Sequence, residues 1–467
     1  MLYDKLKKYS NSGIYPFHMP GHKRSQIQDS ALPYQLDITE IEGFDNLHNA
    51  SGCIKQIESK AQKIYSAPKA HLLVNGATCG VLAAIRTFTR PNDKVLLARN
   101  CHISVYNAVE LCHLKPIYII PQTVDNFGIN ASISPNEVEN LLKSNPDTKL
   151  VILTSPTYEG VVSDIKGISQ ICRNHGVRLF VDEAHGAHFP FSDKFPSEAL
   201  FNGADAAVVS LHKTLPSLTQ TALLLINDIE FDNLFQSNLS IFETSSPSYI
   251  LMSSIENCLN YVSENKACFE QYTNRLASFY EKCKALNRLK ILYNNLPVDN
   301  IFDYDFGKIL ISTANTELNG KELANILREN YKIETELAYT DYVIAMTSVC
   351  DSSDGFDRLA NALSEIDKAL VLGKHNNSYS NIKLPEIQFY PCQKFDFKSE
   401  TLSFEASESK ASLEYIWAYP PGIPLIVPGE IITKEFISSV KQLVADNIDV
   451  ISSQKNMPNL ICVAKTD

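Results

Sequence analysis

The sequence predicts an α/β fold built on a mostly parallel sheet. Short apolar segments that suit buried strands alternate with longer amphipathic segments through the first half of the chain. This alternation is typical of βαβ units, in which helices cover both faces of the sheet. Such sheets bind ligands at the carboxyl ends of their strands, so the residues that follow each strand are the candidates for function. The expected strands are residues 71–75, 94–98, 115–120, 149–154, 177–182, 206–210 and 221–226.

Helical periodicity and turn-rich segments divide the chain further. Residues 78–88 place Val81, Ile85 and Phe88 on one helical face, and a long helical pattern follows over 250–286. The next segment mixes strand-like and helical patterns, as a smaller α+β domain would, and a polar linker lies at 373–381. We therefore expect an N-terminal arm over 1–55, a large domain over 56–250, a small α+β domain over 251–372 and a C-terminal α+β domain over 382–467.

Charge and composition narrow the classes of partner. The 467 residues include 53 Asp and Glu against 42 Lys and Arg, a net charge of -11, which disfavours nucleic acid and anionic membranes as partners. We find no apolar segment near the roughly 18 residues needed to cross a bilayer, and no secretion signal at residues 1–17. The 11 cysteines lack paired spacing, as free thiols in a reducing compartment do. We expect a cytoplasmic protein with a small-molecule ligand.

Two strand ends carry groups that suit a charged ligand. The segment "VNGATCG" (74–80) is typical of the end of a strand, a turn and the start of a helix. At such a helix start, the backbone amides and the helix dipole favour an anion such as phosphate. On its own it also fits an ordinary βα turn. Asp182 ends another strand, either as a buried anion that faces a ligand cation or as a helix cap. His185 and His188 have a spacing that a metal site could use, but further ligands are lacking, so we expect no metal.

Two further strand ends carry an imidazole and an amine. His102 follows the strand at 94–98, although a lone histidine is more often structural. Lys213 lies in "SLHKT" (210–214), directly after a buried strand. Either the chain has turned outward there, or the lysine is partly desolvated. A desolvated lysine has a lowered pKa, and its neutral amine can attack a carbonyl.

Together these groups match the needs of pyridoxal 5'-phosphate. The 74–80 loop suits its phosphate, Asp182 its protonated ring nitrogen, and Lys213 its aldehyde, while an imidazole at position 102 could stack on the ring. Each signal is weak alone, but their order on successive strands makes the combination specific.

The chain also resembles a known family, the ornithine/lysine/arginine decarboxylases in their short form, which are fold-type-I enzymes that depend on pyridoxal phosphate. The resemblance implies a large cofactor-binding domain, a small domain and a C-terminal decarboxylase domain, without the extra N-terminal domain of the long forms. The matching segments are "FHMPGHK" (17–23), "DITEIEGFDNLH" (37–48), "VDEAHGAHF" (181–189), "SLHKTLPSLTQ" (210–220), "TSSPSY" (244–249) and "YPPGIPLIVPGE" (419–430).

The resemblance implies a role for each candidate residue. Lys213 would bond covalently to the cofactor, Asp182 would pair with its ring nitrogen, and His102 would stack on its ring. The remaining expected contacts are His212 and Ser210 with the phosphate or the reacting groups, His185 and Thr157 near the ring hydroxyl, and Ala77, Thr78 and Cys79 in the phosphate loop. Family members form dimers or larger oligomers, and the 244–249 loop would reach the partner subunit's phosphate.

The implied reaction is decarboxylation of a basic amino acid to an amine of polyamine biosynthesis, and we favour arginine over lysine or ornithine. Glu430 and Glu243 are candidates for binding the distal cation of the substrate. Glu40 and Glu42 could equally reach a neighbouring subunit.

Two other functions stay open. A different reaction of the same cofactor, such as transamination, would need an arginine clamp, for which Arg328 and Arg358 are available. A degenerate, non-catalytic homologue with a regulatory role is suggested by departures from the family. Ala77 and Cys79 stand where relatives carry hydroxyls, and Ile103 where they often carry a lysine.

Overall fold

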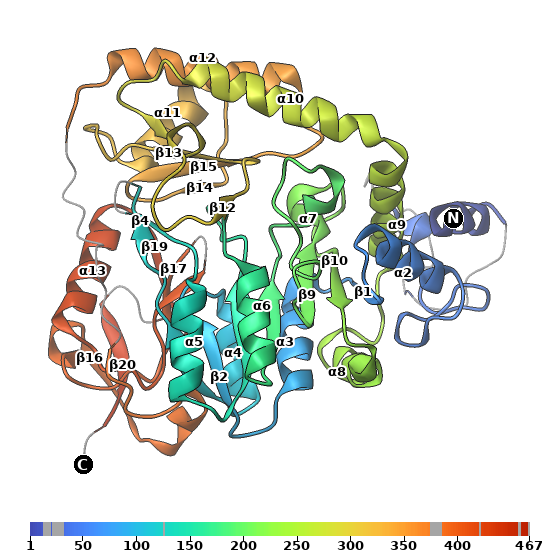
Figure 1. Ribbon diagram of the computed structural model, residues 1–467, viewed down its shortest axis with the longest axis horizontal. Coiled ribbons are helices and arrows are strands. Elements are labelled where there is room, and N and C mark those ends of the chain that lie inside the picture. The colour runs from blue at the N-terminus through green and yellow to red at the C-terminus, as the bar shows by residue number, and fades with distance from the viewer. Residues whose placement is uncertain are drawn as a thin grey trace. The chain divides into compact units, whose positions relative to one another are not determined.

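The computed structural model describes residues 1–12, 20, 32–124, 127–373, 385–419, 422–455 and 459–465. The chain forms two compact units, each assembled from two stretches: Met1–Phe88 with Arg178–Glu270, and Thr89–Val177 with Gln271–Asp467 (Figure 1). Most of the motif at 17–23 and of the linker at 373–381 lies outside the described residues. The four segments expected from the sequence divide the chain differently and stay a prediction.

In the first unit the strands follow the order β1-β10-β9-β8. β8 and β9 pair in parallel, while β10 runs antiparallel to both β9 and β1. All five residues of β9 and of β10 are buried, as expected of continuous apolar strands that are covered on both faces. The bounds are Lys69–Leu73 (β1), Arg178–Asp182 (β8), Ala206–Ser210 (β9) and Ala222–Ile226 (β10).

The strand register brings three strand ends to one edge. Leu73 lies opposite Ala222, which lies opposite Ser210, and Asp182 lies beside Val208. Because β1 and β9 are both antiparallel to β10, they run in the same direction as each other and as β8. The segments that follow Leu73, Asp182 and Ser210 therefore leave from the same edge of this group of strands.

Helix α3 lies close against these strands. It begins at Gly76, two residues before the predicted start, and Gly76 has a φ of +75°, a conformation that glycine adopts without strain. A Cβ at Gly80 would lie 2.7 Å from Leu73 Cδ1 and 3.0 Å from Val208 Cγ2, so a larger residue would have to displace these buried side chains. The helices of the unit are α1 (Leu2–Ser10), α2 (Cys53–Ile64), α3 (Gly76–Phe88), α7 (Leu211–Thr214), α8 (Asp232–Phe242) and α9 (Tyr249–Glu264).

The long helical pattern at 250–286 forms two helices rather than one. α9 ends at Glu264, where Asn265 leaves the helical conformation with a φ of -111° and a ψ of 57°. α10 (Lys266–Cys283) then continues from the first unit into the second.

The second unit contains the parallel strands β6 (Thr148–Thr154), β2 (Lys94–Ala98) and β3 (Lys115–Ile119), in that order. They match the predicted strands closely. Their helices are α4 (Ile103–Leu111), α5 (Pro135–Ser144) and α6 (Ile165–Asn174). The mostly parallel α/β fold class is therefore confirmed.

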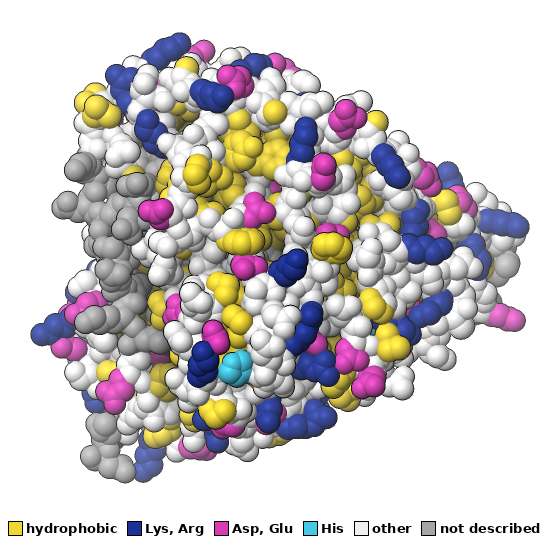
Figure 2. Space-filling view, in the orientation of Figure 1, with side chains coloured by type: hydrophobic (Ala, Val, Ile, Leu, Met, Phe, Trp, Pro, Cys, Tyr) yellow, Lys and Arg dark blue, Asp and Glu magenta, His cyan; other side chains and the backbone are white. Residues whose placement is uncertain are grey.

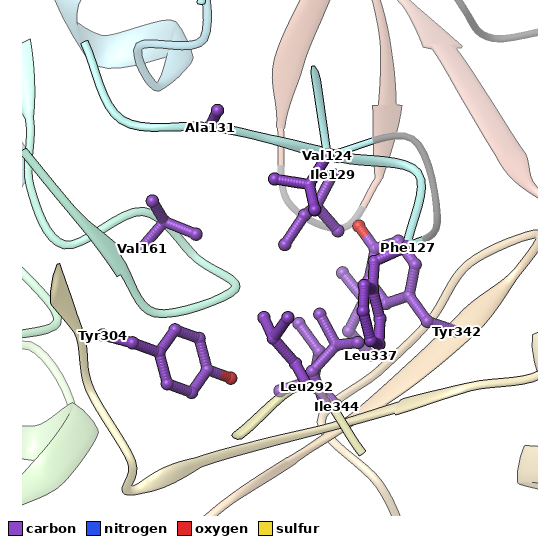
Figure 3. Close-up of a cluster of buried hydrophobic side chains, with 11 residues drawn as sticks. Val124, Phe127, Ile129, Ala131, Val161, Leu292, Tyr304, Leu337, Tyr342 and Ile344 are labelled. Atoms are coloured by element: carbon purple, nitrogen blue, oxygen red, sulfur yellow. The ribbon is translucent and has the colours of Figure 1, made fainter. Parts of the chain in front are cut away.

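Smaller sheets complete the second unit. An antiparallel sheet has the order β11-β13-β15-β14. Its side chains, among them Ile344 of β15, form a buried apolar cluster with Val161 and Leu292 (Figure 3). Its elements are β11 (Lys290–Ile291), β13 (Lys308–Ser312), β14 (Leu337–Ala338), β15 (Tyr342–Met346), α11 (Gly320–Tyr331) and α12 (Ser353–Ala369). The C-terminal part contains β16 (Ser399–Ser403), β17 (Ile416–Tyr419), β18 (Ile423–Ile426), α13 (Lys434–Ala445), β19 (Asp449–Ser452) and β20 (Leu460–Ala464). Two-residue strands are β4 (Thr123–Val124), β5 (Ile129–Asn130), β7 (Val161–Val162) and β12 (Asp303–Tyr304).

Gly80 gives a direct test of the contact between α3 and the strands. We expect Gly80→Val to lower the free energy of unfolding by about 1–3 kcal/mol, because the added atoms overfill the space beside Leu73 and Val208. Urea unfolding of both proteins measures the difference. Asn140→Val, on an exposed position of α5, controls for placing a β-branched residue in a helix. Equal losses in both variants would contradict the proposed close contact.

Candidate active site

The ends of β8 and β9 bring together the candidate residues of the first unit. Asp182 is 4% exposed, and its Oδ1 accepts a hydrogen bond from the Ala184 amide at 3.2 Å. The Ser210 amide in turn donates to the Ala184 carbonyl at 3.2 Å. These bonds tie the segment after β8 to the end of β9, so a buried carboxylate lies beside the turn that carries the lysine.

Lys213 lies on α7, a four-residue helix that follows β9 directly. Its Nζ is 3.1 Å from Nε2 of His185, a buried residue of the segment that follows β8. The chain therefore has not simply turned outward at Lys213, because the side chain is directed back to a buried imidazole.

His212, the neighbour of Lys213, has a defined tautomer. Its Nδ1 lies 2.9 Å from the Thr221 carbonyl, which can only accept, so Nδ1 carries the hydrogen and Nε2 of the neutral ring has the lone pair. Burial lowers the pKa of His212, with the charge of Lys213 acting in the same direction. At pH 7 the ring is thus neutral and can accept a proton at Nε2.

The loop between β1 and α3 has the geometry of an anion site. The Gly76 amide donates to the Gln220 carbonyl at 2.8 Å, which fixes the start of α3. The first amides of a helix have no partner within the helix and point outward with the positive end of its dipole. Thr78 is exposed, whereas Cys79 is buried with its thiol 3.1 Å from the Gly76 carbonyl. Burial raises the pKa of Cys79, so this thiol stays protonated.

These residues fit pyridoxal phosphate. The Ser210 hydroxyl is buried at the end of β9, with no hydrogen-bond partner among the described residues. An unsatisfied buried hydroxyl calls for an explanation, and a bound acceptor such as a phosphate oxygen supplies one. Together with the helix start, the Asp182 carboxylate and the Lys213 amine, it completes the set of donors and charges that the cofactor needs.

His102 and Thr157 belong to the second unit. His102 is the N-cap of α4, and its Nδ1 accepts from the Ser104 amide at 3.2 Å. The Thr157 hydroxyl accepts from the Val161 amide at 3.2 Å within a buried turn. Both side chains thus stabilise local structure, and their predicted contacts with the cofactor stay predictions.

The family model described as "Orn/Lys/Arg decarboxylase, major domain" matches residues 1–299 of this chain. The chain belongs to this family. The predicted resemblance is thereby confirmed. The arginine decarboxylase of Bacillus subtilis (strain 168) is 31% identical over 99% of this chain and 97% of its own length. That of Halalkalibacterium halodurans is 31% identical over 94% of this chain and 92% of its own length.

The fold of this family member is shared with solved lysine decarboxylases. The enzyme from Francisella novicida matches 99% of this chain, and 81% of its own chain is covered, with a TM-score of 0.86 at 18% identity. The constitutive enzyme from E. coli matches 99% of this chain and is covered over 82%, with a TM-score of 0.83 at 17% identity. Both confirm the fold class predicted for the family.

Glu430, one candidate for binding the substrate's cation, lies in a buried ion pair of the second unit. It is fully buried, and its Oε2 accepts from Arg99 Nη2 at 3.1 Å and from the Val427 amide at 2.9 Å. Burial raises the pKa of Glu430, and the Arg99 guanidinium opposes that shift. Arg99 also donates to the Pro424 carbonyl at 2.6 Å, so the pair holds the segment that contains β18. No local pattern in the sequence marks Arg99, because its partner lies 331 residues away.

Glu243, the other candidate for the substrate's cation, lies in the first unit. It is 7% exposed and accepts a hydrogen bond from the Val74 amide at 2.8 Å. Its carboxylate is therefore directed to the start of the loop before α3. The role of either glutamate in substrate binding stays a prediction.

The ion pair makes a stability prediction for Glu430. We expect Glu430→Ala to lower the free energy of unfolding by about 3–5 kcal/mol, because Arg99, whose side chain is only 13% exposed, would be left without its counter-charge. Glu430→Gln keeps the acceptor and should cost less, about 1–3 kcal/mol. Chemical unfolding of the three proteins tests the order. A Glu430→Ala protein as stable as wild type, but with a raised KM for substrate, would instead favour the role in substrate binding.

Proposed function

We propose that this member of the Orn/Lys/Arg decarboxylase family decarboxylates a basic amino acid with pyridoxal phosphate, and that arginine is its substrate. The product would be agmatine, a precursor in polyamine biosynthesis. The observation that carries the proposal is the pairing of the Lys213 amine with His185 at the edge where β8 and β9 end, next to the buried Asp182. The relatives that match nearly the whole chain bear the name arginine decarboxylase, which supports this choice of substrate.

Three residues of the chain have separate roles in the proposed reaction. When bound, the cofactor withdraws electrons from the α-carbon of the amino acid that it carries, so that CO2 can leave. Asp182 keeps the ring nitrogen protonated, because a buried carboxylate stabilises a nearby cation. Lys213 Nζ would hold the cofactor and is the group that would deliver a proton to the α-carbon. His212 is neutral with its lone pair at Nε2, so it carries no proton there to donate and would not compete with the lysine as donor.

Transamination is less well supported, because neither arginine that could form its carboxylate clamp is placed for that role. Arg358 donates to the Tyr331 carbonyl at 2.7 Å, and Arg328 pairs with Glu334 at 3.5 Å, both on the surface of α11 and α12. Each guanidinium thus already binds a neighbouring group on the exposed surface of the protein. This arrangement does not support a role in binding the substrate's carboxylate.

The proposal includes the cellular setting and the assembly. All 11 cysteines are free thiols, which supports a reducing compartment such as the cytoplasm. The described helices include none that is long and apolar enough to cross a membrane. Acidic and basic side chains are interspersed over the face in Figure 2, unlike the uniformly basic surface of a nucleic-acid-binding protein. We also propose a homodimer, which the exposed apolar side chains Phe201 (76%) and Ile241 (56%) of the first unit would help to form.

Lys213 is the first test. We expect Lys213→Ala to abolish decarboxylation and the visible absorbance band of covalently bound cofactor, because the Lys213 amine supplies the covalent bond to the cofactor's aldehyde. Absorbance spectra and CO2 release measure the two effects. Lys194→Ala, an exposed lysine of the same unit, should change neither. Turnover and an intact band in the Lys213→Ala protein would rule out the assignment.

The substrate is tested separately. Purified protein with pyridoxal phosphate is incubated with arginine, lysine or ornithine, and CO2 and the product amine are measured. We expect agmatine from arginine at a kcat/KM at least about tenfold above that for the other two, a difference of about 1.4 kcal/mol in transition-state binding. Preference for lysine or ornithine would correct the substrate, and the lack of product from all three would contradict the reaction.

A further inference from the structure

The segment Phe242–Thr244 joins two parts of the first unit that lie far apart in the sequence. On one side, the Phe242 carbonyl accepts from the Asn75 side chain at 3.3 Å, and Glu243 accepts from the Val74 amide. On the other side, the Thr244 carbonyl lies 2.8 Å from Nε2 of His48. The start of the 244–249 loop is thereby attached both to the anion loop before α3 and to the N-terminal segment.

The bond between Glu243 and Val74 lies at the base of the anion loop. Val74 is the last residue before the turn, and its amide is buried beyond the last paired residue of β1, Leu73. A buried amide without an acceptor is costly, so Glu243 stabilises the conformation from which Gly76 starts α3. The two residues are 169 positions apart, and the bond joins the end of α8 to the end of β1.

Titratable groups surround this carboxyl group. A pocket of about 110 Å³ is lined by Glu243 and by ionisable side chains from three elements: His48 from the 3-10 helix Leu47–Asn49, Lys55 and Glu58 from α2, and His71 from β1.

Further charged groups lie around the pocket. Asp232 of α8 binds His71 Nε2 at 2.8 Å, and Lys69 pairs with Asp232 at 2.8 Å. Cys79 of α3 interacts electrostatically with Glu243. His71 is therefore occupied by Asp232 and Glu58, its two acidic neighbours.

We propose that Glu243 is a positioning residue that holds the anion loop through Val74 and makes the loop's affinity for the cofactor's phosphate depend on pH. This inference rests on the proposed function, because it assumes that the loop at 75–79 binds that phosphate. It assigns Glu243 to the cofactor rather than to the substrate's distal cation.

The direction of the pH dependence follows from the charge of Glu243. Burial raises the pKa of Glu243 to about 7, against the opposing effects of the Val74 amide and of His48. Below that pKa the carboxyl group is neutral and still accepts from Val74 through its carbonyl oxygen. Above it, a negative charge appears at the base of a loop that binds a phosphate dianion, and the two repel. Affinity should therefore be lost as the pH rises through about 7.

The test is a titration of cofactor-free protein with pyridoxal phosphate, followed by absorbance and intrinsic fluorescence, at pH 6.0 and pH 8.5. Other groups, including the cofactor's phosphate, also titrate in this range, so the informative quantity is the ratio of Kd between wild type and Glu243→Gln. The glutamine keeps the acceptor but stays neutral at both pH values. The matched control is Glu230→Gln, because Glu230 is an exposed acid that lies shortly before α8 in the sequence.

We expect the ratio of Kd, wild type over Glu243→Gln, to be near one at pH 6.0 and to rise to roughly three to ten at pH 8.5. Glu243→Ala should bind more weakly at both pH values, by about tenfold, because Val74 loses its acceptor. The ratio of Kd, wild type over Glu230→Gln, should be the same at both pH values. A ratio of Kd for Glu243→Gln that does not change between pH 6.0 and pH 8.5 would overturn the inference. This test does not depend on whether Glu243→Ala folds.

The outcome separates this inference from the proposed function. A wild-type protein that develops no band with pyridoxal phosphate would contradict the cofactor assignment itself. A band that depends on Lys213, together with identical pH profiles for wild type and Glu243→Gln, would contradict only the role of Glu243.

Discussion

The parallel pairing of β8 with β9 is the constraint on which the candidate site depends. The register Asp182 beside Val208 places the buried carboxylate two residues short of Ser210, where β9 ends. The chain then has only the four residues of α7 in which to turn, so Lys213 is returned to the segment after β8 and meets His185. A slip of one residue in this pairing would send these side chains to the opposite face.

The edge of the sheet is held by hydrogen bonds that cross between loops. Gly76 donates to Gln220, and Gln220 itself has a φ of +78°, so the turn before β10 is shaped to receive the start of α3. Val74 is satisfied by Glu243 from the end of α8. Each buried amide of the anion loop's base thus has an acceptor from a different part of the unit. These bonds hold the base of the loop in place before a ligand binds, which lowers the entropy cost of binding.

Buried charges in both units follow one rule. Arg99 pairs with Glu430 in the second unit, and His71 lies between Glu58 and Asp232 in the first. A buried charge without a partner is expensive, so these groups form pairs that fix the segments carrying them. Glu243 differs, because its hydrogen-bond donor, the Val74 amide, carries no charge, and burial raises the pKa of its carboxyl group to about 7.

The sequence alone determined the alternation of strands and helices and the residue types at the strand ends. Apolar segments such as 94–98 and 206–210 were predicted with their bounds, because a strand buried on both faces must be apolar throughout. The motifs around Lys213 and Asp182, together with four further segments along the chain, were sufficient to predict the family. Those features are local, and local patterns are visible in a single sequence.

The tertiary structure alone decided which distant residues meet. The sequence predicted one long helix over 250–286, yet the chain leaves the helix at Asn265, a break that the apolar pattern does not record. Arg99 and Glu430 are 331 residues apart, and Val74 and Glu243 are 169 apart. Nothing in the composition or spacing near these residues marks their partners, because burial creates the need for a partner and only the packed chain supplies it.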